Sequence, residues 1–125
     1  MDARPPCILV AEDDAIVRYA MCRELARDGY CTLEASDGTE ALTRANEYDG
    51  AIQVLVTNVR MPKMDGHELT RAIKIVRPDI KVIIVSAFNE EYFPVAAEKP
   101  DFAFVKPVRY EALKRKIREM LEESG

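Results

Sequence analysis

Short apolar runs alternate along this chain with segments in which apolar residues recur every three or four positions. The runs predict β-strands at Cys7–Ala11, Cys31–Ala35, 53–57, Lys81–Ser86 and Phe102–Val105. The third and fourth runs are almost wholly apolar, which indicates strands buried on both faces, as in the centre of a parallel sheet. The second run alternates apolar and polar residues and therefore suits a strand nearer the sheet edge.

Helical spacing follows four of these strands. Asp14 and Asp65 precede the first and third helical segments, where their carboxylates can accept N–H groups of the first turn. Gly29 and the pair Asp49-Gly50 are expected to end the first and second helices. The positions expected to face the core are Val17, Met21, Leu25, Ala41, Leu42, Ala45, Leu69, Ile73, Val76, Leu113, Ile117, Met120 and Leu121.

The segment 88–100 does not follow this pattern. Pro94 and Pro100 fall inside it, and a proline in a helix interior costs about 3 kcal/mol, so we expect a fourth helix that is short or irregular. The alternation of strands and helices predicts the α/β class, with a doubly wound, five-stranded parallel sheet and helices on both faces. The 125 residues are expected to form one domain, 1–125, with its core at about 7–122.

The charge balance limits the classes of function. The formal net charge is −4 and the pI is about 5.1, whereas a nucleic-acid-binding surface is basic. No run approaches the ~18 apolar residues of a membrane span, and the opening MDARPPC lacks a signal-peptide core. Cys7, Cys22 and Cys31 are odd in number and lack metal-type spacing, so we expect reduced, mostly buried thiols in a cytoplasmic protein.

Polar side chains lie where the predicted strands end. Glu12 and Asp13 follow the first strand, Asn58 follows the third, Ser86 ends the fourth and Lys106 follows the fifth. Ligands bind outside the carboxyl ends of parallel strands, so these groups are expected to converge. Paired carboxylates suit a hard cation such as Mg²⁺, and a hydroxyl with an ammonium suits phosphoryl oxygens. The site lacks a nucleophile, which an aspartate at position 58 would supply.

These residues lie in four motifs, ILVAEDD, VLVTNVRMPKMDG, VIIVSA and FVKP. With these motifs, in this order and at close to the usual spacing, the chain resembles the receiver domain of two-component response regulators over about 7–122. The resemblance implies a flavodoxin-like sheet of strand order 2-1-3-4-5 and no enzymatic role. It also implies that a sensor histidine kinase or a phosphotransfer protein, and a downstream protein, are partners.

The resemblance implies a role for each residue of the site. Glu12 and Asp13 correspond to the acidic pair that helps to hold Mg²⁺, and the backbone carbonyl of Arg60 corresponds to a further metal ligand. Asn58 stands at the position of the phosphoacceptor aspartate. Ser86 and Lys106 correspond to the conserved hydroxyl residue and lysine, respectively.

Asn58 departs from the family pattern. A neutral amide cannot form an acyl phosphate, although its carbonyl oxygen can still face a metal ion. The lost negative charge is expected to weaken Mg²⁺ binding and to lessen the repulsion around Glu12 and Asp13. The chain is therefore either a natural module that works without phosphorylation or an altered form of an ordinary receiver. Deamidation of Asn58 ranks last, because the β-branched Val59 hinders the cyclisation.

A second departure concerns the surface that the resemblance assigns to partners. The family usually has an aromatic residue three positions before the lysine, where this chain has Ala103 between Phe102 and Phe104. Lys99-Pro100 stands where Gly-Ala is common. We expect the face formed by 88–100, the fifth strand and the last helix to be unusual in shape and mobility and to lack the aromatic switch. A homodimer through this face is one option.

Other functions compete with the phosphorelay receiver. The alternative is an interaction module that keeps the receiver fold and binds without phosphorylation. A flavin or nucleotide binder is disfavoured, because Glu12, Asp13 and Asp14 would repel phosphate after the first strand. A metal-dependent phosphohydrolase is disfavoured, because its Asp-x-Asp spacing is not present in these residues.

Overall fold

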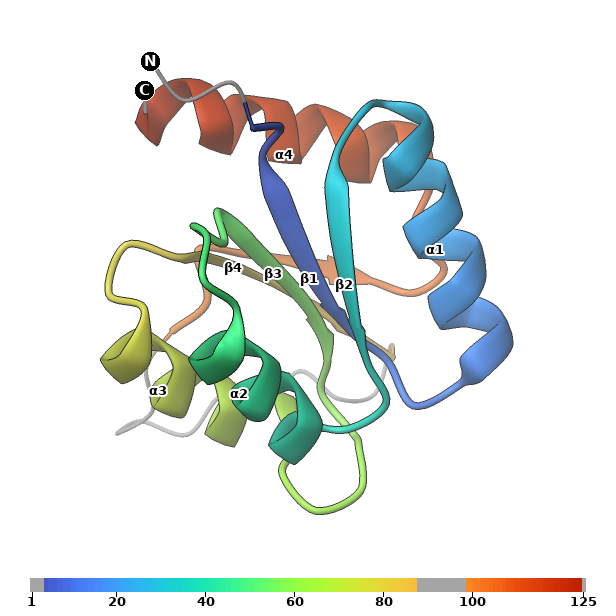
Figure 1. Cartoon of the computed structure of the whole chain (residues 1–125). Coiled ribbons are helices and arrows are strands. Elements are labelled where there is room, and N and C mark those ends of the chain that lie inside the picture. The colour runs from blue at the N-terminus through green and yellow to red at the C-terminus, as the bar shows by residue number, and fades with distance from the viewer. Residues whose placement is uncertain (1–3, 88–98, 125) are drawn as a thin grey trace.

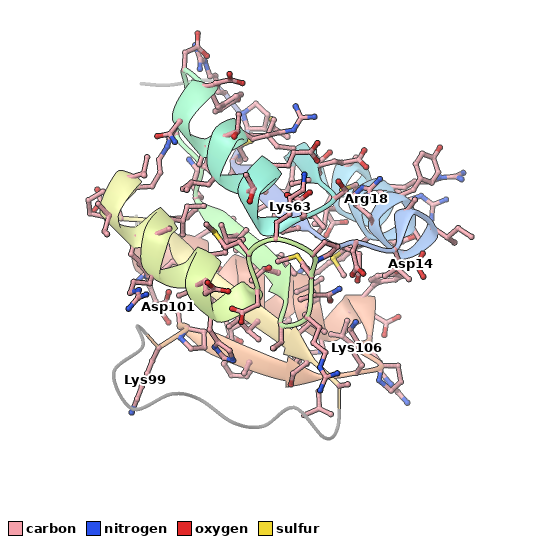
Figure 2. All side chains as sticks on the ribbon, turned by 90° about the horizontal axis from the view of Figure 1, so that it is seen from below. Asp14, Arg18, Lys63, Lys99, Asp101 and Lys106 are labelled. Carbon is pink, nitrogen blue, oxygen red and sulfur yellow. The ribbon has the colours of Figure 1, made fainter. Side chains whose placement is uncertain are left out.

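The computed structural model describes residues 4–87 and 99–124 and has a five-stranded parallel sheet at its centre (Figure 1). The strands lie in the order β2-β1-β3-β4-β5. Their bounds are β1 Cys7–Ala11, β2 Cys31–Ala35, β3 Val54–Asn58, β4 Lys81–Ser86 and β5 Phe102–Val105. The predicted class, strand order and edge position of the second strand are confirmed. The strands are parallel, so their carboxyl ends all lie at the same end of the sheet. Figure 2 shows the molecule from below, with Asp101 and Lys106 next to the two ends of β5.

Helices cover both faces of the sheet. Their bounds are α1 Ala15–Arg27, α2 Gly38–Glu47, α3 Gly66–Val76 and α4 Tyr110–Ser124. Asp14 caps α1 by accepting the N–H groups of Ile16 and Val17. Asp65 accepts the Glu68 N–H, and the Glu68 side chain accepts the Asp65 N–H, so α3 begins with a complete capping box. Both predicted caps are therefore confirmed.

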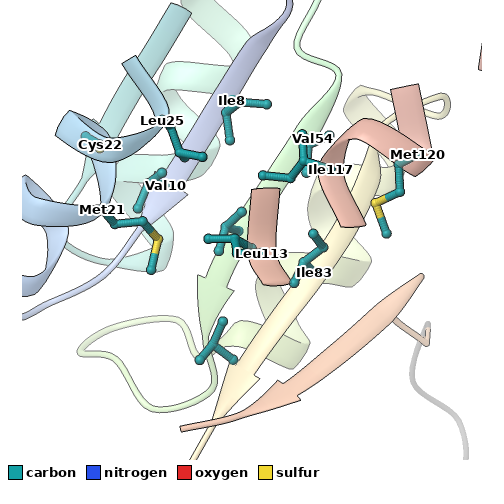
Figure 3. Close-up of a cluster of buried hydrophobic side chains, with 12 residues drawn as sticks. Ile8, Val10, Met21, Cys22, Leu25, Val54, Ile83, Leu113, Ile117 and Met120 are labelled. Carbon is teal, nitrogen blue, oxygen red and sulfur yellow. The ribbon is translucent and has the colours of Figure 1, made fainter. Parts of the chain in front are cut away.

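Two apolar layers hold the helices to the sheet. The first lies under α1 and α4 (Figure 3) and consists of Ile8, Val10, Met21, Cys22, Leu25, Val54, Val56, Ile83, Val85, Leu113, Ile117 and Met120. The second lies under α2 and α3 and consists of Leu9, Ala11, Ala35, Ala41, Ala45, Ile52, Leu55, Leu69, Ile73, Ile80, Val82 and Ile84. Successive residues of β1, β3 and β4 enter opposite layers, as the alternation of side chains along a strand requires. This explains why their sequences are apolar throughout.

Three details of the prediction are wrong. Val17 and Val76 remain 39% and 38% exposed. Val17 borders a cavity at the end of the sheet, and Val76 is the last residue of α3, whose buried face ends at Ile73. The third strand occupies Val54–Asn58 and not 53–57, so Asn58 is itself part of the strand. The short or irregular fourth helix is expected over 88–100, of which residues 88–98 lie outside the described part of the chain. Among those that are described, no helix is long and apolar enough to cross a membrane.

Candidate functional site

Asn58 is the last residue of β3, and hydrogen bonds from Thr57 and Gly66 fix the backbone at this point. The Thr57 hydroxyl donates to its carbonyl oxygen at 3.0 Å, and the Gly66 N–H donates to the next carbonyl, that of Val59, at 2.7 Å. A Cβ at Gly66 would overlap the Asn58 carbonyl oxygen. Glycine at this position therefore lets the N-terminus of α3 pack directly against the end of β3.

The side-chain amide of Asn58 lies between the two carboxylates that follow β1. Its Nδ2 atom donates to Glu12 Oε2 at 2.6 Å and to Asp13 Oδ1 at 3.1 Å. Asn58 and Glu12 are 6% and 4% exposed, so water screens the arrangement little. One amide thus supplies both of its donors to two acids that would otherwise repel each other.

Glu12 is the buried acid of the pair. Burial raises the pKa of its carboxyl, and the Asp14 N–H, which donates to Oε2 at 2.9 Å, together with Lys106 opposes this shift. Lys106 Nζ lies 3.9 Å from Glu12 Oε1. An ion pair thus joins this lysine to the acidic turn, and its contribution is limited because the Lys106 side chain is 42% exposed.

Arg18, on α1, binds the acidic turn from its other side, a role that the sequence analysis did not predict. Its Nη1 donates to the Glu12 carbonyl oxygen at 2.8 Å, and its Nε donates to Glu34 Oε1, on β2, at 3.2 Å. Figure 2 shows Asp14, Arg18 and Lys106 at this end of the molecule, around the loop that carries Lys63. The helical spacing placed Arg18 one turn after Asp14, but it did not indicate which backbone group the guanidinium would bind.

The remaining predicted site residues, Ser86 and Arg60, lie at the same end of the sheet. Ser86 is buried at the end of β4, and its carbonyl oxygen accepts the Lys106 N–H at 2.8 Å. Arg60 is exposed in the loop after β3. The use of its backbone carbonyl as a metal ligand stays a prediction. The structure thus links Glu12, Asp13, Asn58 and Lys106 by side-chain contacts.

A largely apolar cavity of about 470 Å³ opens beside these groups. Glu12, Asn58 and Lys106 border it, together with Val17, Met21, Val85, Pro107, Val108 and Tyr110. Sequence reasoning missed this cavity because its walls come from α1, β4 and the segment that leads into α4. Val17 is partly exposed because its side chain lines this cavity.

The aromatic residues of β5 lie on the opposite face from Ala103. The rings of Phe102 and Phe104 meet edge to face, with their centroids 4.9 Å apart, and Lys116 of α4 lies 4.2 Å above the Phe102 ring. Side chains alternate along a strand, so neither ring takes the place of a side chain at position 103. The absence of a usual aromatic switch stays a prediction that this arrangement supports.

The side chains at the strand ends carry oxygen atoms of the kind that a hard cation binds. Two carboxylates and an amide converge, and oxygen donors of these kinds bind Mg²⁺. Within residues 4–87 and 99–124, however, no group of three or more histidine, cysteine, aspartate or glutamate side chains is placed to hold a metal ion. The amide would have to present Oδ1 in place of Nδ2, which would break both of its hydrogen bonds.

The family model of the response regulator receiver domain matches residues 8–118. The chain belongs to the response regulator receiver domain family. The sequence-based resemblance and the fold class are thereby confirmed. Receiver domains of this family act in two-component signalling, where they interact with histidine kinases or phosphotransfer proteins and with downstream partners, and they bind Mg²⁺ in the active site.

Known proteins similar to this receiver domain differ in length. It is 38% identical over 120 residues to the sensor kinase CckA of Brucella abortus (strain 2308), covering 92% of this chain and 12% of that protein. It is 32% identical over 116 residues to the response regulator receiver protein CpdR of the same strain, covering 91% of this chain and 95% of CpdR. The chain thus spans a small part of the first relative and nearly all of the second.

A solved structure shows the same fold with a metal ion. The receiver domain of the sensor histidine kinase PA1611 from Pseudomonas aeruginosa PAO1 superimposes with a TM-score of 0.81 at 20% identity. The alignment covers 94% of this chain and 98% of that one. In that protein a magnesium ion is coordinated in the active-site cleft.

Proposed function

We propose that this chain is a receiver module of a two-component phosphorelay in which Asn58 occupies the phosphoacceptor position. The observation that carries the proposal is the place of Asn58 at the end of β3, 2.6 Å and 3.1 Å from the two acids that follow β1. Its amide has no carboxylate oxygen to attack phosphorus, so the chain does not form an acyl phosphate there. It acts as a signalling module and not as an enzyme.

The other groups of the site keep the roles that a phosphorylated receiver would need. The place of Lys106 beside Glu12 supports its role as a point charge that faces phosphoryl oxygens, and Ser86 ends β4, the strand next to β3. The proposed ligands of Mg²⁺ are the side chains of Glu12 and Asp13, the side-chain amide oxygen of Asn58 and the backbone carbonyl of Arg60. This ion would supply positive charge opposite phosphoryl oxygens, and its affinity is reduced because position 58 carries no charge.

The proposed partners are a sensor histidine kinase or a phosphotransfer protein on the input side and a protein on the output side. A cytoplasmic location accords with such partners. The net charge of −4 argues against nucleic acid. Self-association through the fifth strand and the last helix is a further proposal, and its third component, the segment 88–98, lies outside the described residues.

A second candidate is a receiver-like module that binds partners without phosphorylation. The hydrogen bonds from Asn58 to Glu12 and Asp13 favour it, because they satisfy the acidic pair in the absence of both cation and phosphoryl group. This candidate keeps the family fold and uses one constant shape of the binding face.

Intact-mass spectrometry distinguishes the two candidates. This chain and its Asn58→Asp variant are incubated with a small acyl phosphate and Mg²⁺, with Asn58→Ala as a control for side reactions. The first candidate predicts one added phosphoryl group on Asn58→Asp and none on the other two chains. If Asn58→Asp also stays unmodified, the site has diverged beyond position 58 and the second candidate is favoured. Phosphorylation of the unaltered chain would contradict both.

A variant of Lys106 tests the role of the ammonium in this site. In the Asn58→Asp background, Lys106→Met should slow phosphoryl uptake at least about tenfold, because one oriented charge on the transferring group is removed. Arg109→Met is the matched control, since Arg109 is an exposed basic residue three positions further along the chain. Equal rates for the two variants would contradict the assignment of Lys106.

A further inference from the structure

Two cysteines face each other at the end of the sheet opposite to Asn58. Cys7 opens β1 and Cys31 opens β2, and the two residues are direct partners in the register of these parallel strands. Paired strands lie about 4.8 Å apart, which is within the Cα separation of about 4.4–6.8 Å that a disulfide bridges. The two Sγ atoms are already only 3.0 Å apart, so a small rotation of the side chains would bring them to the ~2.0 Å of a disulfide bond.

The backbone holds this pair in place. The Cys7 N–H donates to the Gln53 side-chain oxygen at 2.6 Å, and the Cys7 carbonyl accepts the Gln53 N–H at 2.9 Å. The Cys31 N–H donates to the Pro6 carbonyl oxygen at 2.9 Å. Because both main chains are fixed, the thiols meet at a high effective concentration, which favours reaction between them over reaction with other groups.

The two thiols differ in access. Cys7 is buried, and burial together with its hydrogen bond to Cys31 raises the pKa of its thiol to about 12, so Cys7 is protonated at neutral pH. Cys31 is half-buried on the edge strand, and its Sγ lies 3.6 Å from the hydroxyl oxygen of Tyr48. A small oxidant can therefore reach Cys31 before Cys7, and Cys7 is placed to act second.

We propose that Cys7 and Cys31 form a redox-sensitive pair that closes to a reversible disulfide in the presence of hydrogen peroxide. The Cys31 sulfur attacks the peroxide O–O bond, which breaks and yields a sulfenic acid on Cys31 and one water molecule. The Cys7 sulfur then attacks the Cys31 sulfur and displaces the hydroxyl, which leaves as water with the Cys7 proton. Overall, two thiols lose two electrons and two protons, and one H₂O₂ becomes two H₂O. A dithiol reverses the reaction by exchange.

The bond would change the molecule away from the Asn58 site. It would fasten the edge strand β2 to β1 and close a loop that contains α1 and the acidic turn at Glu12. A closed loop restricts the unfolded chain and so stabilises the folded one. The inference does not rest on the proposed function, because neither thiol takes part in the chemistry at position 58.

The full chain treated with H₂O₂ provides the test. We expect an intact mass lower by two hydrogen atoms, two of the three thiols closed to alkylation, and a proteolytic fragment that joins Cys7 to Cys31. The midpoint of thermal unfolding should rise by about 5–15 °C, and dithiothreitol should reverse all four changes. Cys22→Ala is the matched control, since Cys22 is buried among the residues under α1 and should leave the result unchanged. Cys31→Ser should abolish the mass loss.

Three results would overturn the proposal. One is oxygen added to Cys31 without a bridge, which would show that Cys7 does not act second. Another is the absence of the Cys7–Cys31 bridge, seen either as no change of mass or as a bridge that includes Cys22. The third is equal formation of the Cys7–Cys31 bond in urea, which would show that the folded arrangement does not direct the pairing.

Discussion

At the scale of single residues, the character of the site depends on one nitrogen atom. Asn58 Nδ2 donates to Glu12 and Asp13, whereas a carboxylate at the same place would add a third acceptor to two acids. The amide therefore changes the site in two ways. It removes the nucleophile, and it supplies the hydrogen-bond donors that hold the acids together without a cation.

Arg18 should contribute to stability through the acidic turn. Arg18→Met removes the donor to the Glu12 carbonyl and the ion pair with Glu34, and we expect the free energy of unfolding to fall by about 1–2 kcal/mol. Urea denaturation measures this change. Arg23→Met, an exposed arginine on the same helix, should change it by less than about 0.5 kcal/mol. Equal effects would mean that the contacts of Arg18 are not specific.

Gly66 should tolerate no side chain. Gly66→Ala places a Cβ against the Asn58 carbonyl, and moving α3 away should lower the free energy of unfolding by about 2 kcal/mol or more. Gly29→Ala is the comparison, because its Cβ meets no atom within 4 Å and only its φ of +90° is unfavourable. We expect this second change to cost about 1 kcal/mol. A larger loss for Gly29→Ala in urea denaturation would contradict this account of the close contact.

At the scale of helices and strands, Asp101 joins three elements. It lies just before β5, and its Oδ2 accepts Lys74 Nζ from α3 at 2.9 Å and the Val82 N–H of β4 at 2.7 Å. Burial favours the protonated acid, but Lys74 and the Val82 N–H outweigh it and hold the pKa of Asp101 below its usual value. The ionised carboxylate therefore stabilises the contact between α3 and the end of the sheet that carries β5.

Asp101→Asn should remove a pH-dependent part of stability. Because the folded pKa is lowered, the contribution is complete above the unfolded value of about 3.9 and is lost as the pH falls through the folded pKa. The difference in unfolding free energy between the two chains should be largest near neutral pH and shrink toward zero in acid. Urea denaturation across this range measures it. A difference that stays constant with pH would show that Asp101 does not act through its charge.

The elements were predictable from sequence to the extent that they follow from local chemistry. The sequence predicts Asp14 and Asp65 as caps because a carboxylate before a helical pattern has few other local roles. It wrongly predicts Val17 and Val76 in the core, since periodicity gives the apolar side of a helix but not how far a neighbouring element covers it. Arg18 and the donor role of Asn58 were missed for a related reason. A sequence gives the chemistry of a side chain, whereas its direction depends on elements distant along the chain.

At the scale of the whole molecule, the two ends of the sheet carry different chemistry. The carboxyl ends of the strands hold Glu12, Asp13 and Asn58, and the other end holds the thiols of Cys7 and Cys31. β1 connects the two, because it begins at Cys7 and ends one residue before Glu12. Oxidation of the two thiols would therefore be a second input to the receiver domain, one that does not use position 58.

In this receiver domain the Asn58 amide holds the acidic pair together without a metal ion. Urea denaturation of this chain and of Asn58→Asp, each with a chelator and with saturating Mg²⁺, tests this most directly. We predict that Asn58→Asp is less stable by about 1–3 kcal/mol with the chelator, because three carboxylates meet. It should regain about 1.5–3 kcal/mol in Mg²⁺, while the unaltered chain changes little. An equal gain from Mg²⁺ in both chains, or no loss for Asn58→Asp with the chelator, would show that the amide does not hold the acidic pair together.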